Sequence, residues 1–220
     1  MTDIWGISTD LLEKSVAEQE ERQESTGVLQ SGIYPVTVEK AYLSKSQGGA
    51  TAFNLDMVSD DGKKIFYTGW IRSGDEKGNK ATYTDKNGNE VPLPSWFQVE
   101  HFLKAVGKKL EELKPVPAKM ERFGRTEEIL ALPQLEGARC KAVVRQYENE
   151  YNGEVSIKYD IEDFLRLDGS RVGSKGRDEK AWAEFLAKNP IRKLRNKPAP
   201  KPEDGAKKEE AANAVLDAWG

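Results

Sequence analysis

The sequence predicts a mainly β fold with peripheral helices, a β+α class in which three strands, one helix and two further strands follow one another. Three observations predict it. Five segments alternate apolar and polar residues, glycine-containing turn clusters separate them, and a stretch with helical spacing lies between the third and fourth segments. Charge is segregated toward both ends of the chain, which predicts terminal arms distinct from this core.

The first three strands are predicted within residues 32–72. Turn clusters at residues 46–49 and 60–62 separate them, and the glycines there accept the positive φ that tight turns require. In the first two strands an apolar residue recurs at every second position: Tyr34, Val36 and Val38, then Phe53, Leu55 and Met57. This period of two is typical of strands with one buried face.

The third strand, residues 63–72, has two unlike faces. One face is apolar and carries Ile65, Tyr67 and Ile71. The other combines cations with rings: Lys64, Phe66, Thr68, Trp70 and Arg72. Such a face suits a single-stranded nucleic acid, because bases stack on rings and phosphates pair with cations. The alternative is packing against a second sheet, which is the commoner use of aromatic residues in strands.

A long polar connection, residues 73–94, follows the third strand. Asn87-Gly88 predicts a two-residue hairpin turn within it, with Tyr83 opposite Val91. The connection exceeds the usual loop length, which is typical of a binding loop or of disorder. Its lysines are either phosphate contacts or solvated loop residues: Lys77, Lys80 and Lys86.

One core helix is predicted from Ser95, with Gly107 at its end. Its buried face is spaced as in a helix: Trp96, Phe97, Val99, Phe102, Leu103 and Val106. Prolines then mark a connection, within which we expect a short helix over residues 126–132.

A second hairpin, turning at Asn152-Gly153, supplies the last two strands. One face of its first arm is small and apolar: Ala138, Cys140, Ala142 and Val144. The other face again pairs cations with a ring: Arg139, Lys141, Val143, Arg145 and Tyr147. On the return arm, Lys158 lies on the polar face, between the apolar residues Ile157 and Tyr159. A further helix is predicted after Asp178, whose side chain can cap it.

This order of elements, β-β-β-α-β-β, is that of a five-stranded OB-type barrel. We therefore divide the chain into an acidic N-terminal helical arm (1–31), an OB-like nucleic-acid-binding domain (32–188), a basic proline-rich linker (189–205) and an acidic C-terminal tail (206–220). Residues 1–30 hold seven acids and two bases, a net charge of −5, whereas residues 188–201 hold six bases and no acid.

Composition excludes several classes of protein. One cysteine, Cys140, and one histidine, His101, rule out a zinc site or a disulfide framework within one chain. No phosphate-binding loop, dinucleotide fingerprint or nucleophile elbow is present, and we expect no cofactor, no metal and no catalytic residue. No apolar run approaches the ~20 residues of a membrane span, and the acidic start lacks a signal peptide's charge, so we expect a cytoplasmic protein.

The two basic and aromatic faces form the most coherent functional signal. An OB-type barrel would bring them together, so we predict one groove for single-stranded DNA, lined by Lys64, Phe66, Trp70, Arg72, Arg139, Lys141, Arg145, Tyr147 and Lys158. A carboxylate-metal nuclease is the enzymatic alternative, because acids cluster at Asp56, Asp60 and Asp61 and at Asp160, Glu162 and Asp163. Those acids also fit turns and a solvated strand face.

The chain resembles the replicative single-stranded-DNA-binding proteins of tailed bacteriophages. The resemblance covers about residues 32–167 and the last residues, and three phrases carry it: GIYPVTVEKAYLSKSQGGATAFNLDMVSDDGKK, LEGARCKAVVRQYENEYNGEVSIKYDIEDFL and the terminal DAWG. It implies an OB barrel, binding of single strands without sequence preference during replication and recombination in the host cytoplasm, and no enzymatic activity.

The resemblance also implies that the tail recruits replication or recombination proteins or a phage polymerase, here through Leu216, Asp217 and Trp219. The family's tail is more densely acidic and ends in phenylalanine, whereas Trp219 is penultimate here and Gly220 is last. The acidic N-terminal helix would serve homo-oligomerisation or contact with the polymerase. A transcription or recombination cofactor that acts mainly through protein contacts is the alternative function.

Overall fold

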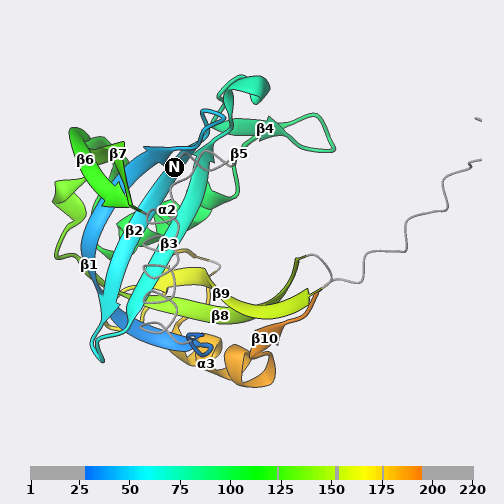
Figure 1. The fold of residues 1–220 in the computed structure, drawn as a ribbon. Helices are drawn as coiled ribbons and strands as arrows, with labels where there is room; N and C mark the ends of the chain where they lie inside the picture. Colours follow the sequence, from blue (N-terminus) through cyan, green and yellow to red (C-terminus); the bar gives the residue numbers. More distant parts are fainter. Residues whose placement is uncertain (1–27, 123, 152–153, 175, 195–220) are drawn as a thin grey trace, which may run out of the picture.

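Five strands form a curved main sheet in the order β3-β2-β1-β8-β9 (Figure 1). The computed structural model describes residues 28–122, 124–151, 154–174 and 176–194 of the 220-residue chain. The five strands, antiparallel to their neighbours, are β1 (Gly32–Lys45), β2 (Thr51–Ser59), β3 (Lys64–Arg72), β8 (Arg139–Tyr151) and β9 (Glu154–Leu165). The predicted mainly β class with helices is confirmed, and the β8–β9 hairpin extends beyond the rest of the sheet as a twisted arm (Figure 1).

Smaller elements surround this sheet. The hairpin of β6 (Val116–Arg122) and β7 (Arg125–Ala131) pairs with β1, and β10 (Ile191–Arg192) runs parallel to β8. The hairpin of β4 (Thr82–Thr84) and β5 (Glu90–Pro92) forms a separate sheet, in which Tyr83 faces Val91 as predicted. The helices are α2 (Ser95–Ala105) and α3 (Glu179–Lys188), with single 3-10 turns η1 (Asp75–Lys77), η2 (Leu110–Glu112) and η3 (Pro133–Leu135).

The sheet does not close into a barrel, because no backbone ladder joins β3 to β9 in the described part of the chain. Side chains span the gap instead. The Phe66 N–H donates to the Tyr159 hydroxyl at 3.2 Å. Gln98 of α2 reaches both edges, accepting from the Tyr67 hydroxyl at 3.1 Å and donating to the Ile161 carbonyl at 2.9 Å. Helix α2 therefore lies across the open side of the sheet and connects its two edge strands.

The main core lies between the concave face of the sheet and α2. The alternating residues of β1, β2 and β3 that were predicted to be buried are buried, Tyr34 alone being only partly so. The Phe102 ring of α2 lies 6.1 Å from Phe53 and 5.2 Å from Phe164, and Tyr67 packs edge-on against Phe164 at 5.6 Å. Burial also raises the pKa of the Tyr67 hydroxyl well above its ordinary value. These rings join β2, β3, α2 and β9 into one unit.

A second, smaller core lies on the opposite face of β8. Helix α3, capped by Asp178 as predicted, packs there and encloses Val143, Leu165, Trp182 and Leu186. Asp163 connects three elements at this point. Its carboxylate Oδ2 accepts a hydrogen bond from the Trp182 indole N–H at 3.2 Å, and its Oδ1 lies 2.7 Å from the His101 Nδ1 of α2. The middle of β8, residues 142–144, is therefore buried on both faces, although the sequence of the strand alternates.

Three local sequence-based expectations differ from the structure. Phe97, expected on the buried face of α2, is 62% exposed, because the buried face of the helix is made by Val99, Phe102 and Leu103. The short helix expected over residues 126–132 is wrong, because this segment forms β7 in full register with β6 across a turn in which Gly124 takes a φ of 67°. The linker expected from residue 189 begins inside the fold, since β10 pairs with β8 at Gln146 and Tyr147. The N-terminal arm up to residue 27 and the tail from residue 195 lie outside the described residues. No helix in the described ranges has the length and apolarity needed to cross a bilayer.

We expect Phe102→Ala to lower the free energy of unfolding by roughly 3–5 kcal/mol, because it leaves a cavity among packed rings. Phe97→Ala on the same helix is the matched control. Phe102 has no exposed surface whereas Phe97 is 62% exposed, so the control should change stability by less than about 0.5 kcal/mol. Urea denaturation followed by circular dichroism measures both, and equal losses would contradict the role given to α2.

Candidate nucleic-acid interface

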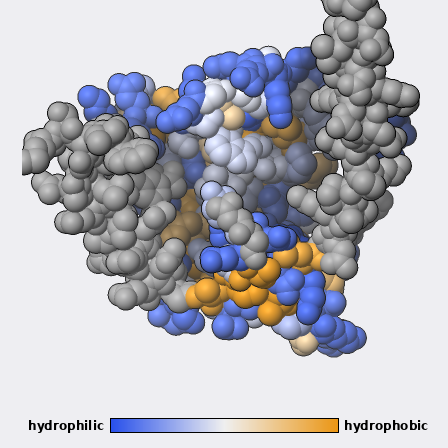
Figure 2. All heavy atoms as spheres, turned by 45° about the vertical axis from the view of Figure 1, so that its right-hand side comes forward, coloured by the Kyte–Doolittle hydropathy of each residue, from blue (hydrophilic) through white to orange (hydrophobic). Residues whose placement is uncertain are grey.

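One groove of about 750 Å³ opens beside the end of β3. It is bounded by the β1–β2 turn, the η1 loop and the β4–β5 hairpin. Two rings on different elements line it, Trp70 of β3 at 47% exposure and Tyr83 of β4 at 46%. Three cations, Arg72, Lys77 and Lys80, and two acids, Glu76 and Glu90, also line it. In the view of Figure 2, hydrophilic residues lie along the top of the molecule, paler residues lie below them, and a hydrophobic patch lies in the lower part.

Close backbone contact fixes one wall of the groove. The Asp75 N–H of η1 donates to the Gly48 carbonyl of the β1–β2 turn at 2.8 Å. A Cβ on Gly49, which has a φ of 75°, would lie 2.2 Å from the Asp75 carboxylate, and a Cβ on Gly74 would lie 2.5 Å from the Gly48 oxygen. Both positions therefore require glycine for the turn to dock on the loop.

Arg72 braces a second wall of the groove. Its guanidinium donates from Nε and Nη2 to the Asn79 carbonyl at 3.2 and 3.0 Å, and from Nε to the Asn79 Oδ1 at 3.1 Å. Asn79 is the one described non-glycine residue with a positive φ, 50°. The arginine thus stabilises a strained loop residue while keeping its charge at the groove.

The β4–β5 hairpin forms the remaining wall and has its own internal support. The Asp85 carboxylate accepts from the N–H groups of Asn87 and Asn89 at 2.8 and 2.9 Å. The hydrogen bond from Asn89 is the main reason that the pKa of Asp85 lies below its ordinary value. At the base of the hairpin, the Leu93 N–H donates to the Ala81 carbonyl at 3.0 Å. Tyr83 therefore projects from a defined hairpin.

The residues predicted on the outer face of β3 share that face. Lys64, Thr68, Trp70 and Arg72 are exposed and Phe66 is half-buried, whereas Ile65, Tyr67 and Ile71 are buried. Thr68 donates to the Asn54 Oδ1 at 3.0 Å, which links this face to β2. Only Trp70 and Arg72 of the five also line the groove.

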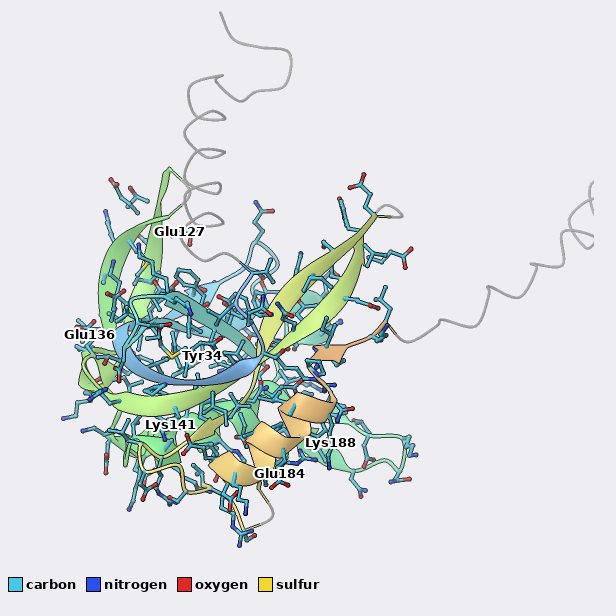
Figure 3. The ribbon with its side chains drawn as sticks, turned by 90° about the horizontal axis from the view of Figure 1, so that it is seen from below. Tyr34, Glu127, Glu136, Lys141, Glu184 and Lys188 are labelled. Carbon is cyan, nitrogen blue, oxygen red and sulfur yellow. The ribbon has the colours of Figure 1, made fainter. Side chains whose placement is uncertain are left out.

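The cations predicted on β8 contact acceptors within the protein. The Arg139 Nη2 donates to both Asp60 carboxylate oxygens at 2.7 and 2.9 Å, and Lys141 contacts both Glu179 oxygens at 2.8 and 2.7 Å. Figure 3 shows Lys141 beside α3, the helix that carries Glu184 and Lys188. These two cations fasten a turn and a helix to β8.

Arg145 and Tyr147 also face the α3 side of β8. The Arg145 guanidinium lies 5.0 Å from the Phe185 ring, and its Nε donates to the Asn189 carbonyl at 3.0 Å. Arg192 of β10 stacks over the Tyr147 ring at 5.1 Å, and Lys158 pairs with Tyr147 across the hairpin. In Figure 1, α3 lies below β8 and β9, whereas the β4–β5 hairpin lies at the opposite end of the sheet. The structure thus groups Trp70 and Arg72 in the groove and the β8 residues with α3 and β10.

Sequence reasoning did not select Tyr83, and it left Lys77 and Lys80 as undecided loop lysines. The length of the connection between β3 and α2 could have indicated these residues, because it exceeds the usual length of a loop between two such elements. The tail residues predicted to bind partners, Leu216, Asp217 and Trp219, lie outside the described residues.

The acidic clusters behind the nuclease alternative are paired with cations. Asp60 binds Arg139, Asp61 lies 2.7 Å from the Lys63 ammonium, and Asp160 lies 3.4 Å from Arg192. Within the described part of the chain, no three His, Cys, Asp or Glu side chains are grouped as metal ligands would be. Cys140 is fully buried, and this burial raises the pKa of its thiol to about 12, which suits packing rather than nucleophilic chemistry.

No protein-family model matches this sequence, and no curated protein matches it. Function is therefore inferred from the geometry of the groove and from the chemistry of the residues that line it.

We expect Arg145→Ala to lower stability by roughly 1–2 kcal/mol, because it removes a partly buried cation–ring contact and a hydrogen bond. Affinity for single-stranded poly(dT) should stay within about twofold if the role of Arg145 is structural. Lys188→Ala is the control, since it removes one exposed positive charge from α3. Urea denaturation measures the structural role, and anisotropy titration measures a role in DNA binding. A large loss of affinity with unchanged stability would show that Arg145 contacts DNA.

Proposed function

We propose that this protein binds single-stranded DNA without sequence preference, with the Trp70–Tyr83 groove as the primary contact. The single observation that carries the proposal is the pairing of two half-exposed rings, on separate elements, with three cations around one groove. Exposed aromatic rings offer flat apolar faces, and nucleobases are flat ligands that stack on such faces.

The chemistry of the groove suits a strand of any sequence. Stacking contributes about 1–3 kcal/mol per base and accepts every base, because each has a π face. Arg72, Lys77 and Lys80 would contact phosphates, which carry no sequence information. From Trp70, the outer face of β3 leads through Thr68 and Phe66 to Lys64, so a strand leaving the groove would follow β3.

The arrangement of strands supports an OB-type reading of the fold. The strand order β3-β2-β1-β8-β9 is the order of the five strands in an OB fold, and α2 follows β3 in the sequence as the OB helix does. The gap between β3 and β9 is bridged by side chains. Proteins of this type bind oligonucleotides on the face of their second and third strands and beside the adjoining loops. The groove occupies that position, between β3 and the β1–β2 turn.

The biological role that we propose follows the resemblance to phage replicative single-stranded-DNA-binding proteins. The protein would protect and present single strands during phage DNA replication and recombination, in the host cytoplasm and without catalysis. Partner proteins would be recruited through Leu216, Asp217 and Trp219 of the tail. Truncation after residue 205 separates DNA binding from partner recruitment: affinity for DNA should persist while recruitment fails.

We expect Trp70→Ala and Tyr83→Ala each to weaken binding to poly(dT) by about 5- to 100-fold, the equivalent of one lost stacked base. Fluorescence anisotropy of a labelled oligonucleotide at fixed salt measures the affinity. Phe97→Ala is the matched control, because it removes an exposed ring that does not line the groove. Wild-type affinity in both groove variants would refute the proposed interface, and an equal loss in the control would show that the effect is not local.

Removal of two groove cations should change the salt dependence of binding. For single strands, the slope of log K against log salt is about −0.7 per phosphate contact, so Lys77→Ala/Lys80→Ala should reduce its magnitude by about 1.4. The control variant Lys119→Ala/Lys188→Ala removes two exposed lysines elsewhere and should keep the wild-type slope. Identical slopes in the wild type, the groove variant and the control variant would show that Lys77 and Lys80 do not contact the phosphates.

A further inference from the structure

A second hollow, of about 640 Å³, lies between α2, η2 and the base of the β4–β5 hairpin, and its lining is mainly apolar. Trp96, Val99 and Leu103 line it. Two further apolar residues of the lining remain largely uncovered: Phe97 at 62% and Leu110 at 51% exposure. An apolar hollow with uncovered apolar residues in its lining is typical of a surface that a partner segment covers.

The rim of this apolar hollow is basic. Lys104, Lys108 and Lys109 line it together with Glu100 and Glu111, and Lys104 is paired with Glu100. Lys108 and Lys109 take part in no ion pair among the described residues. A segment that matches the hollow must therefore combine apolar side chains with negative charge.

We propose that the C-terminal tail of the same chain docks in this apolar hollow. The sequence Ala-Val-Leu-Asp-Ala-Trp-Gly at residues 214–220 offers Val215, Leu216 and Trp219 to the apolar lining. Asp217 and the terminal carboxylate lie beside them in sequence and would face Lys108 and Lys109. The proposal does not depend on DNA binding, because Thr82 is the only described residue that lines both the hollow and the groove.

The tail is long enough to reach the hollow. Nineteen residues, 195–213, separate the end of the described chain at Leu194 from the docking sequence. Such a linker spans about 24 Å as a flexible coil and about 63 Å when extended. A domain of this size has a radius of gyration of only about 15 Å. Because tethering gives an effective concentration near the millimolar range, an intrinsic dissociation constant of about 1 mM is sufficient for half occupancy.

The apolar hollow shares a wall with the groove. Ala81, Thr82 and Pro92 of the β4–β5 region line the hollow, and Thr82 also lines the groove beside Tyr83. A docked tail would therefore contact the back of the hairpin that carries Tyr83, and it would leave the groove itself open.

Disulfide trapping in the full-length chain tests the proposal. Glu111→Cys in the lining of the hollow is combined with Ala218→Cys in the tail, and oxidation is followed by non-reducing electrophoresis and peptide mapping. The native thiol does not interfere, because Cys140 is fully buried. We expect the pair at residues 111 and 218 to form an intramolecular disulfide, and Lys108→Glu/Lys109→Glu to slow its formation at least fivefold.

Glu150→Cys with Ala218→Cys is the matched control. It removes the same charge from an exposed position of β8, close to where the described chain ends, since the Leu194 N–H donates to Glu148 on that strand at 3.1 Å. An undocked tail would meet residue 150 at least as often as residue 111. Trapping at residue 111 that is at least fivefold faster supports docking, whereas equal rates, faster trapping at residue 150 or disulfides between two chains would overturn it.

Discussion

The fold depends on how the gap between β3 and β9 is filled. No ladder joins these two edge strands in the described structure, so α2 supplies the connection. Gln98 hydrogen-bonds to both strands, and Phe102 packs between the rings of Phe53 and Phe164. Helix α2 therefore provides the apolar seal of the open side and, together with the Phe66–Tyr159 hydrogen bond, its polar bridge. The start of α2 is fixed in turn, because the Trp96 indole N–H donates to the Ile71 carbonyl at the end of β3.

This arrangement also positions the groove. The end of β3 carries Trp70 and Arg72, and the chain between β3 and α2 carries the β4–β5 hairpin. Because α2 is held against β3 and β9, the hairpin is anchored at both ends, by β3 and by the helix. The groove and the apolar hollow thus lie on two sides of the β4–β5 hairpin, whose position is determined by the core.

Local patterns predicted much of this structure. Alternation identified the five main strands, Asn87-Gly88 identified the hairpin that sets Tyr83 opposite Val91, and Asp178 identified the start of α3. Residues 126–132 were misread because the pairing of β7 with β6 and β1 is a tertiary effect that overrides a weak helical pattern.

The candidate site was harder to predict, for a physical reason. A strand pattern shows which residues share a face, but it does not show what covers that face. Helix α3 covers the outer face of β8, so Val143 is buried and Lys141 and Arg145 bind groups of the protein itself. On β3 the same kind of pattern leaves Trp70 exposed. The difference lies in a helix more than thirty residues away in sequence, which no local period encodes.

The docking of the β1–β2 turn on η1 has a consequence for how a ligand would be received. With no room for a Cβ at Gly49 or Gly74, the two loops pack closely together and form a ledge that is already in place in the protein without a ligand. Flexible loops lose conformational entropy when a ligand orders them, about 1–2 kcal/mol per residue fixed. For any ligand that the groove accepts, a ledge already in this shape would avoid that loss.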